Sequence, residues 1–254
     1  MLQIERYHHI VSELEKHGSI SIKNLMNVVS PSRSTIRRDL LELEKMHKLV
    51  RTRGGAVAVG NNTDFMREFE YRKNQQHEEK LRIAHAALQF VNEQEAILID
   101  EGSTSFELAK LLGRFRSLTV ATCSLNIAWE LRCAENIELL VIGGMMKRKS
   151  LSMSGSIAEQ TVRGISSNRF FMTADGVNAE QGCMCYGAEE ATVKRSMIKS
   201  VKETILLVDH TKFNKNALIN ICELKDLNTI VTGKEADRKI VSRIQSLGIN
   251  IVLA

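Results

Sequence analysis

Apolar residues near the start of the chain recur at the spacing of short helices. A first helix is predicted over residues 2–17 and would end at Gly18. A second begins after Ser21, a suitable N-cap, and ends before Pro31, because the residue preceding a proline is forced out of helical geometry. Ser32 would cap a third. The inner apolar positions are Ile10, Val11, Leu14, Leu25, Val28 and Val29.

The third helix has two sides of different character. Its inner side carries Ile36, Leu40 and Leu43, and its outer side carries Ser34, Arg37, Arg38 and Leu41. Arginine can bind guanine with two hydrogen bonds in the major groove, and hydroxyls can reach phosphates. Two arginines alone would more often indicate a solvated face, but a helix, a short helix, a turn and a polar-faced helix together form a helix-turn-helix. The residues expected to contact DNA here are Ser32, Ser34, Thr35, Arg37 and Arg38.

A β-hairpin wing is predicted over residues 49–57, turning at Gly54 and Gly55. Arg51 and Arg53 alternate onto one strand face, where they would lie along a phosphate backbone or a minor groove. Charge agrees with this assignment. Residues 1–60 hold ten Lys or Arg against six Asp or Glu, whereas the remaining residues hold twenty-five against twenty-four. The basic excess lies in the same region as the predicted DNA reader, which indicates nucleic acid as the partner.

From His77 onward, short apolar strands alternate with helical patterns. Strands are predicted at 96–100, 118–122, 137–142, 169–173, 204–208, 229–232 and 249–253. Helical patterns lie at 77–91, with a stripe of Leu81, Ala84, Leu88 and Val91, and near 104–113, 125–134, 187–201 and 234–246. Apolar strands separated by helices indicate a parallel sheet covered on both sides. The predicted fold is α/β, with a winged helix-turn-helix domain at 1–58, a linker with some helix at 59–76 and a parallel-sheet domain at 77–254.

Composition narrows the class of protein. The five cysteines, an odd number without framework spacing, fit a reducing cytoplasm rather than a disulfide scaffold. No segment approaches the roughly 20 apolar residues that span a bilayer, and the N-terminal pattern is unlike a signal peptide. We therefore expect a cytoplasmic protein without a membrane partner.

Ligands of parallel sheets bind at the carboxyl ends of the strands. The turn Asp100-Glu101-Gly102-Ser103-Thr104-Ser105 follows the first predicted strand and opens a helix. Glycine allows close approach to the backbone, free amides favour an anion, and hydroxyls add donors, so the turn suits a phosphate group. Ser103 or Thr104 could equally serve only as a helix cap, and both interpretations stay open.

Further candidates occupy equivalent positions after the other strands. They are Ser124, Gly143, Gly144, Asp175 and Lys212. Lys212 is the better supported, because a lysine fixed by the nearby Asp209 is a suitable point charge for phosphate. Residues 147–149 are basic but more typical of a solvated loop. Glu189, Glu190 and Lys194 open a helix, where acids favour the helix dipole even without a function.

Several motifs together resemble one family. Arg6-x3-Ile10-x3-Leu14 followed by Ser32-x2-Thr35-Ile36-Arg37-Arg38-Asp39-Leu40 resembles the helix-turn-helix signature of DeoR-family bacterial transcription regulators. The later motifs are Asp100-x-Gly102-Ser103-Thr104, Ser124-Leu125-Asn126, Gly143-Gly144, residues 152–155, Glu189-Glu190 with Val193-Lys194-Arg195, and Asp209-x-Thr211-Lys212-Phe213. Ser30-Pro31, Arg53 and Cys123 depart from the family pattern of Gly-Val, His and Asn.

The resemblance implies a repressor of a carbohydrate-utilisation operon that binds double-stranded operator DNA as a homo-oligomer. Its C-terminal domain would resemble the sugar-phosphate isomerase and CoA-transferase fold and would sense a phosphorylated sugar or related metabolite, without enzymatic activity, cofactor or metal. The expected effector-binding residues are Asp100, Gly102, Ser103, Thr104, Ser105, Ser124, Gly143, Gly144, Asp175, Glu190, Lys194 and Lys212.

Two other functions remain as alternatives. An isomerase-like enzyme would use Asp100, Asp175 or Glu190 as base and Lys212 as electrophile. A metal or redox sensor would use Cys183 and Cys185 with Cys123 or Cys222, although no His or Cys pair completes a four-ligand zinc set.

Overall fold

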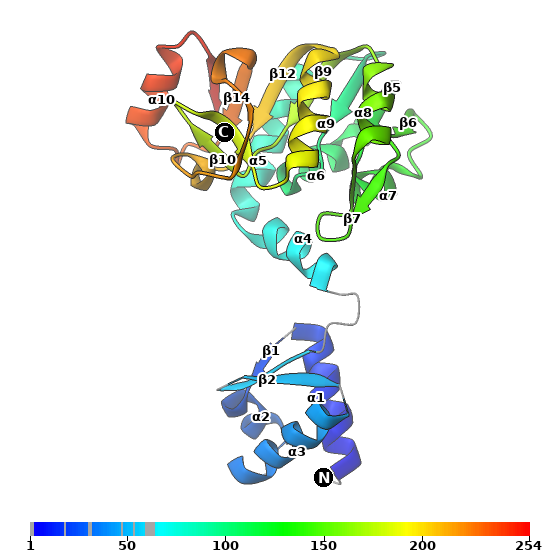
Figure 1. Ribbon diagram of the computed structural model, residues 1–254, viewed down its shortest axis with the longest axis vertical. Coiled ribbons are helices and arrows are strands. Elements are labelled where there is room, and N and C mark those ends of the chain that lie inside the picture. Colours follow the sequence, from blue (N-terminus) through cyan, green and yellow to red (C-terminus); the bar gives the residue numbers. More distant parts are fainter. Residues whose placement is uncertain (1–2, 18, 30–31, 47, 53, 59–63) are drawn as a thin grey trace. The chain divides into compact units, whose positions relative to one another are not determined.

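The computed structural model describes residues 3–17, 19–29, 32–46, 48–52, 54–58 and 64–254 (Figure 1). The chain divides into two units, Met1–Asp64 and Phe65–Ala254. Gly18, Ser30, Pro31 and Arg53, each of which carries an expectation from the sequence, lie outside the described residues.

The N-terminal unit contains the predicted helix-turn-helix and wing. Its helices are α1 (Gln3–His17), α2 (Ile22–Val29) and α3 (Arg33–Lys45). Strands β1 (Ser19–Ser21), β2 (Leu49–Thr52) and β3 (Gly55–Ala58) form an antiparallel sheet in the order β1-β3-β2. The sequence pattern did not predict β1. Gly55 lies in β3 rather than in the turn, and it must be glycine because a Cβ there would stand 1.9 Å from the Ile20 carbonyl oxygen.

A small hydrophobic core and two serine caps hold these helices. Of the inner positions predicted for α1 and α3, Val11 is half-buried and the others are buried, and Leu25 of α2 joins them. The side chains of the predicted Val28 and Val29 lie outside the described part of the chain. The Thr35 amide donates to Ser32 Oγ over 3.2 Å, and the Asn24 amide donates to Ser21 Oγ over 3.1 Å. Both predicted N-caps are therefore confirmed.

The C-terminal unit is built on a parallel sheet of seven strands in the order β15-β14-β12-β9-β4-β5-β6. The strands are β4 (Ala96–Ile99), β5 (Leu118–Thr122), β6 (Ile137–Val141), β9 (Ser167–Met172), β12 (Val201–Leu207), β14 (Thr229–Thr232) and β15 (Asn250–Leu253). Each corresponds to a predicted strand. Central strands are buried on both faces, as Ile97, Leu98 and Ile99 show, which confirms the α/β fold class.

Helices cover both faces of this sheet (Figure 1). One hydrophobic cluster joins the sheet to α5 (His77–Ala87), α6 (Ser103–Leu111) and α7 (Leu125–Leu131), and a second joins it to α8 (Ser156–Arg163), α9 (Ala188–Lys199) and α10 (Arg238–Gln245). α4 (Asp64–Asn74) lies in the segment expected to be a linker with some helix. No helix among the described residues is long and apolar enough to cross a membrane.

Several short elements were not predicted. They are α8, the hairpin of β7 (Met145–Lys147) and β8 (Ser152–Ser154), and a small sheet of β10 (Gly176–Asn178), β11 (Gly182–Cys185) and β13 (Ile219–Cys222). Single-turn 3-10 helices occur at η1 (Leu88–Phe90), η2 (Leu112–Arg114), η3 (His210–Lys212) and η4 (Leu224–Asp226).

The apolar stripe predicted for residues 77–91 was partly wrong. Leu81 and Leu88 are only half-buried, whereas Ile83 and Ala87 are fully buried. The helix α5 packs on α6 and β14 at once, which buries Ile83 and Ala87. From Leu88 onward the chain tightens to 3-10 geometry at η1, which alters the rotation per residue there. The same inner side buries Lys80, which the pattern did not predict.

Candidate functional site

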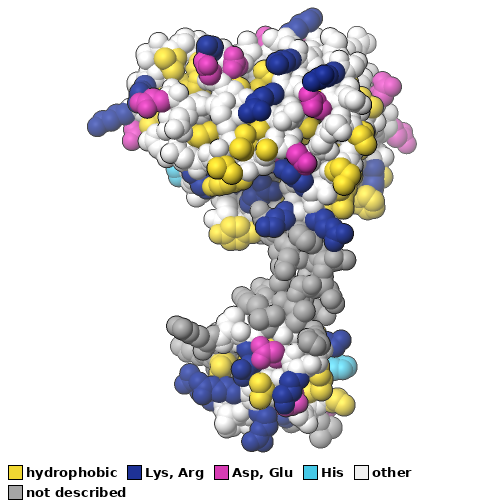
Figure 2. All heavy atoms as spheres, viewed as in Figure 1, with side chains coloured by type: hydrophobic (Ala, Val, Ile, Leu, Met, Phe, Trp, Pro, Cys, Tyr) yellow, Lys and Arg dark blue, Asp and Glu magenta, His cyan; other side chains and the backbone are white. Residues whose placement is uncertain are grey.

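α3 presents the side chains predicted to read DNA. Ser32, Ser34, Arg37 and Arg38 are exposed and Thr35 is half-buried, while Ile36, Leu40 and Leu43 are buried beneath them. No described residue pairs with the guanidinium groups of Arg37 and Arg38. Figure 2 shows Lys and Arg side chains on the surface of this unit. Arg33, which the pattern overlooked, is also exposed at the first position of the helix.

A buried ion pair fixes α3 to α1. Asp39 is 2 % exposed and accepts from Arg6 Nε over 2.7 Å and from Arg6 Nη2 over 3.0 Å. Such a bidentate pair is geometrically specific, because the planar guanidinium and the carboxylate must align. The pair therefore sets the angle at which α3 presents its outer side.

The wing is joined to the same helix through Arg51. Its backbone amide donates to Glu44 Oε1 over 2.9 Å, and its Nε donates to Glu44 Oε2 over 2.8 Å. Arg51 is thus exposed but engaged with α3, whereas its predicted companion Arg53 lies outside the described residues.

The C-terminal unit has a cavity of about 800 Å³ at the carboxyl ends of β4, β9 and β12. Of the predicted effector residues, it is lined by Gly102, Ser103, Thr104, Asp175, Glu190, Lys194 and Lys212. The helix α6 begins at this cavity. Its N-cap is Gly102, so no side chain at the cap position accepts a hydrogen bond from the backbone amides of the first turn. A Cβ at Gly102 would stand 2.3 Å from Thr173 Oγ1, so the turn requires glycine for packing.

The predicted residues Asp100, Ser105, Ser124, Gly143 and Gly144 are not among the lining residues of this cavity. Ser105 Oγ donates to the Asp100 and Gly102 carbonyls, and Ser124 Oγ accepts from the Ile127 amide as the N-cap of α7. The hydroxyls of these two serines therefore stabilise the local backbone. A Cβ at Gly144 would stand 2.6 Å from the Ser154 carbonyl oxygen, a packing constraint.

A buried ion cluster forms the floor of the cavity. The Lys194 ammonium lies 2.8 Å from Asp100 Oδ2 and 3.0 Å from Glu190 Oε1, and it donates to the Thr173 carbonyl over 3.0 Å. Burial alone would raise the pKa of Asp100, but the charge of Lys194 and hydrogen bonds from Glu101 and Thr173 lower it to about 2. The cluster joins β4 to α9.

Glu101 and Cys123 extend this cluster in uncharged form. Burial and the adjacent Asp100 charge raise the pKa of Glu101 well above its usual value, so its carboxyl group holds a proton beside Asp100. Cys123 Sγ donates to Glu101 Oε2 over 3.6 Å, and burial raises the pKa of this thiol. Asp100, Glu101 and Cys123 are close enough to ligate a cation, but the Lys194 ammonium already occupies the position next to them.

The cavity is also lined by cations that the sequence analysis did not select as effector-binding residues. They are Arg72, Lys80, Lys147, Arg148, Lys149 and Lys215. Figure 2 shows Lys and Arg side chains gathered where α4 and β7 lie in Figure 1. The basic residues 147–149 thus line the cavity, and Lys147 lies 3.3 Å from Glu190 Oε2.

Lys80 differs from the other cations because it is 3 % exposed. Its ammonium donates to the Arg72 carbonyl, the one acceptor found for it among the described residues. Burial lowers the pKa of Lys80 to about 8, opposed by Asp209 and assisted by Lys212 and Arg72. The burial of Lys80 could have been predicted from the sequence, because this lysine lies on the same side of the helix as Ile83, Ala84 and Ala87.

The expected pairing of Lys212 with Asp209 was wrong. Asp209 Oδ1 accepts from the Thr211 amide and hydroxyl as the cap of η3, and no ion pair to Lys212 occurs among the described residues. The nearby His210 is instead held by Glu79, whose Oε2 lies 2.6 Å from His210 Nδ1. Lys212 consequently faces the cavity without a carboxylate partner in the described part of the chain.

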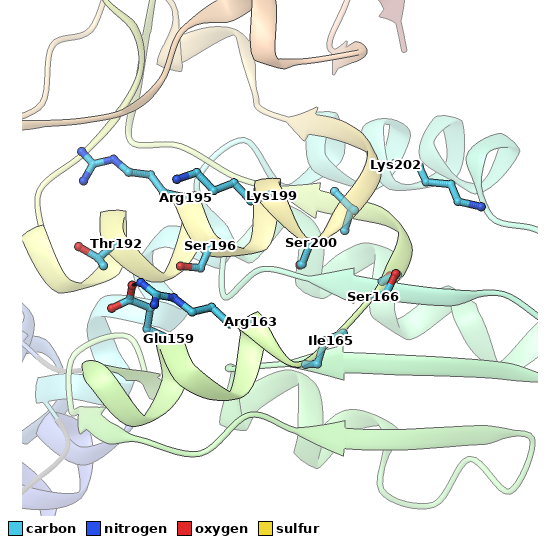
Figure 3. Close-up of a pocket in the computed structure, with 12 residues that line it drawn as sticks. Glu159, Arg163, Ile165, Ser166, Thr192, Arg195, Ser196, Lys199, Ser200 and Lys202 are labelled. Atoms are coloured by element: carbon cyan, nitrogen blue, oxygen red, sulfur yellow. Dashed lines mark hydrogen bonds and ion pairs between the residues drawn. The ribbon is translucent and has the colours of Figure 1, made fainter.

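A second cavity of about 720 Å³ lies at the amino ends of β9 and β12, between α8 and α9 (Figure 3). Two of its cations, Arg163 and Arg195, bind acceptors within the unit. Arg163 Nη2 lies 2.5 Å from Glu159 Oε1, and Arg195 Nε donates to the Ile221 carbonyl over 3.2 Å. Four cations line this groove, against eight in the cavity at the carboxyl ends.

Among the described residues, the cysteines do not form a four-ligand metal group. Cys183 and Cys222 face each other in the β11 and β13 register, and Cys123, Cys183, Cys185 and Cys222 are all free and buried. The one potential metal-ligating group among the described residues contains Cys123 and none of the other three. Burial raises the pKa of Cys185 to about 12, which keeps this thiol protonated.

Comparisons with known proteins cover both units. Residues 6–61 match the DeoR-like helix-turn-helix domain, and residues 75–234 match the DeoR C terminal sensor domain. The transcriptional regulator YulB of Bacillus subtilis, itself uncharacterized, is 32 % identical over 251 residues, covering 99 % of this chain and 96 % of that protein. The glycerol-3-phosphate regulon repressor of Escherichia coli K12 is 28 % identical over 235 residues, 91 % of each protein.

Among solved structures, ribose 5-phosphate isomerase A from Methanocaldococcus jannaschii aligns with a TM-score of 0.41 at 19 % identity, over 54 % of this chain and 55 % of that one. The family assignment rests on the two family matches, because each falls within one of the two units and together they span most of the sequence. The chain therefore belongs to the DeoR family: it is a DNA-binding transcription regulator rather than an enzyme, with a helix-turn-helix reader and a C-terminal sensor domain.

Proposed function

We propose that this regulator is a repressor of a carbohydrate-utilisation operon and that a phosphorylated sugar or sugar derivative, bound in the 800 Å³ cavity, controls its affinity for operator DNA. The protein would act in the cytoplasm as a homo-oligomer whose readers bind repeated half-sites. A relative at 28 % identity is named for a regulon of glycerol 3-phosphate, which is a phosphorylated metabolite.

The observation that carries the proposal is the buried Lys80 ammonium. A charged group removed from water needs hydrogen-bond partners, and the described residues supply only the Arg72 carbonyl. Lys212 lines the same cavity, as does the start of α6, where backbone amides favour an anion. A phosphate group bound there would supply the acceptors that Lys80 lacks.

Other lining residues suit the rest of such a ligand. Asp175, Glu190 and the exposed Tyr186 line the cavity, and Asp175 Oδ2 accepts from the Tyr186 amide over 3.3 Å. Carboxylates accept hydrogen bonds from hydroxyl groups. The cavity thus offers cations for a phosphate and carboxylates, Asp175 and Glu190, for sugar hydroxyls.

The proposed DNA-binding residues are Ser32, Ser34, Thr35, Arg37, Arg38, Arg51 and Arg53. α3 presents the first five on its outer side or at its start, and Arg51 lies on the wing. We assign the base-edge contacts to Arg37 and Arg38, because they are exposed and lack partners among the described residues. Arg51 would contribute phosphate contacts, since Glu44 already fixes its orientation.

α4 provides a physical connection between the cavity and the preceding chain. Tyr71 and Arg72 line the cavity, and Ser103 Oγ donates to the Arg72 carbonyl over 3.4 Å. Phe69 is buried and its ring meets that of Phe106 edge-on at 5.4 Å. A ligand that draws Lys80 or Ser103 toward its phosphate changes the hydrogen bonds that hold the last turn of α4.

The test is a thermal-shift screen of the full chain with phosphorylated sugars, sugar alcohols and sugar acids, each beside its unphosphorylated counterpart. A ligand that binds the native state raises the melting temperature by mass action. We expect stabilisation by a phosphorylated compound and none by the free sugar. Lys212→Ala should lose this response while keeping operator affinity, and Lys199→Ala, an exposed lysine of the second cavity, serves as control. Equal stabilisation by the free sugar, or a fully responsive Lys212 variant, contradicts the assignment.

A further inference from the structure

β6 forms one edge of the seven-stranded sheet, and in the described part of the chain it pairs only with β5. An edge strand exposes a row of unpaired amide and carbonyl groups, which proteins usually protect with charges, proline or a covering segment. β6 contains one charged residue, Glu138, at the beginning of the strand. Leu140 and Val141 point to opposite faces, and each is 42 % exposed.

Exposed apolar residues continue beyond the strand. Met145 and Met146 on β7 are 70 % and 46 % exposed, and Ile157 at the start of α8 is 60 % exposed. Met145 Cγ would lie 3.8 Å from a Cβ at Gly155, so β7 reaches the N-terminus of α8. We name these residues the β6 edge patch: Leu140, Val141, Met145, Met146 and Ile157. Figure 2 shows hydrophobic side chains on this side of the unit, near β7.

The size of the patch fits a protein interface. From the exposed fractions, its five residues together present roughly 500 Å² of surface, comparable to the largest patch on a typical monomer. Pairing of the β6 backbone would add to this, toward the roughly 800 Å² that each partner buries in a standard interface.

We propose that the β6 edge patch binds a second copy of this chain, with the two β6 strands antiparallel about a two-fold axis. In this arrangement the same strand of each copy forms both halves of the interface, so two copies make a closed dimer and no further copy can add to it. With the axis at Leu140, Glu138 lies opposite Ile142 of the other copy, so no like charges meet. The choice of a second copy rests on the proposed function, because each chain has one reader and half-sites come in pairs.

This surface shares a strand with the effector cavity. β7 contributes Met145 and Met146 to the patch, and the next residue, Lys147, lines the cavity and pairs with Glu190. A ligand that displaces Lys147 from Glu190 moves β7 and so changes the surface on which the second copy rests. Ligand binding and the spacing of the two readers are coupled through this strand.

The test measures the mass of the full chain in solution by size-exclusion chromatography with light scattering at about 10 μM, because interfaces of standard size have Kd values from micromolar to picomolar. The wild type is expected as a dimer or larger assembly of the 28.6 kDa chain. The double variant Leu140→Lys, Met145→Lys should lower the mass and weaken operator binding about tenfold or more, since linked readers gain affinity from each other. The matched control is Leu253→Lys, a leucine on β15 at the opposite edge of the sheet whose exposure, 51 %, lies between those of Leu140 and Met145.

Single Met145→Lys, at the most exposed position, replaces the double variant if the latter does not fold. Stabilisation of the variants by the phosphorylated ligand, or by inorganic phosphate, is measured in parallel and should persist. Loss of that stabilisation with unchanged mass would be a failure of the proposed sensor, not of this interface. A monomeric wild type, an unchanged mass of the folded patch variants, or dissociation by Leu253→Lys instead overturns the proposal.

Discussion

Replacing Lys80 with methionine removes a buried ammonium whose described hydrogen-bond acceptor is the Arg72 carbonyl. Burial lowers the pKa of Lys80 from 10.5 to about 8, so at pH 7 the group is charged in the folded and the unfolded chain. The difference between the pKa values of Lys80 in the unfolded and the folded chain corresponds to about 3 kcal/mol, by which the buried charge destabilises the folded state at pH 7. Methionine keeps the aliphatic stem and has no charge to bury.

The variant also loses the hydrogen bond to the Arg72 carbonyl, at about 1–2 kcal/mol for a charged donor. The net expectation is therefore an increase of about 1–2 kcal/mol in the unfolding free energy of the ligand-free C-terminal unit, or roughly 3–6 °C in melting temperature. Because the folded pKa lies below the unfolded one, the destabilisation is complete below pH 8 and disappears as pH rises from 8 to 10.5. The stability difference between the variant and the wild type should close over that range.

Ligand binding should change in the opposite direction. A phosphate group in contact with the Lys80 ammonium gains a charge-assisted hydrogen bond of about 1.5–3 kcal/mol, so Lys80→Met should bind the effector roughly 10- to 150-fold more weakly. Affinity of the wild type should also fall as pH rises through 8, where the lysine loses its proton.

Guanidinium unfolding followed by the fluorescence of Trp129, the one tryptophan of the chain, reports on the C-terminal unit, and titration calorimetry gives the effector affinity. A Lys80→Met protein that is less stable than the wild type at pH 7 would refute the electrostatic reasoning. Unchanged effector affinity would remove Lys80 from the proposed phosphate site.

Three further substitutions test other parts of the structure. Asp39→Ala removes the carboxylate that Arg6 binds and should lower the melting temperature of the N-terminal unit; an unchanged melting temperature would show that the pair contributes little. Arg38→Ala removes an exposed side chain and should weaken operator binding about tenfold or more without altering stability, and wild-type affinity in a gel-shift titration would contradict the reader assignment. Gly102→Ala places a Cβ 2.3 Å from Thr173 Oγ1 and should lower the melting temperature of the C-terminal unit; wild-type melting would show that the turn adapts.

Local patterns sufficed for much of the fold. α3 was predictable because its cap, Ser32, and its buried side are both encoded within the helix itself. Strands such as β5 and β14 were predictable because a continuous apolar run is needed where both faces are covered. β1 has three residues and is stabilised by pairing with β3, which lies far along the chain, so no local signal could identify it.

The effector-binding residues were predictable where they follow a strand, because ligands of parallel sheets bind at the carboxyl ends of the strands. Those on helices before the first strand were not predictable. Gly102, Ser103 and Lys212 follow strands, and the carboxyl ends of neighbouring parallel strands converge. Arg72 and Lys80 precede the first strand, on α4 and α5, and only packing of these helices brings them to the same cavity.

Hydroxyl groups illustrate a second limit of sequence reasoning. A serine after a strand can donate to a ligand or cap the following helix, and the residue type is the same in both cases. In this fold Ser103 lines the cavity, while Ser124 caps α7 and Ser105 bonds to backbone carbonyls. The direction of the side chain decides between the two roles, and that direction depends on tertiary packing.

The charges around the cavity explain why a phosphorylated ligand is favoured over a free sugar. Asp100 and Glu190 are balanced by Lys194 and Lys147 at 2.8–3.3 Å, and Glu101 is protonated, so the floor of the cavity carries no net charge. The remaining acidic lining residues are Asp175 and Asp209, whereas the remaining basic ones include Arg72, Lys80, Arg148, Lys212 and Lys215. A neutral sugar would leave this excess of positive charge unopposed, with Lys80 still buried. A doubly charged phosphate would offset part of it and supply acceptors at the same place, which is the physical basis for selectivity between the two.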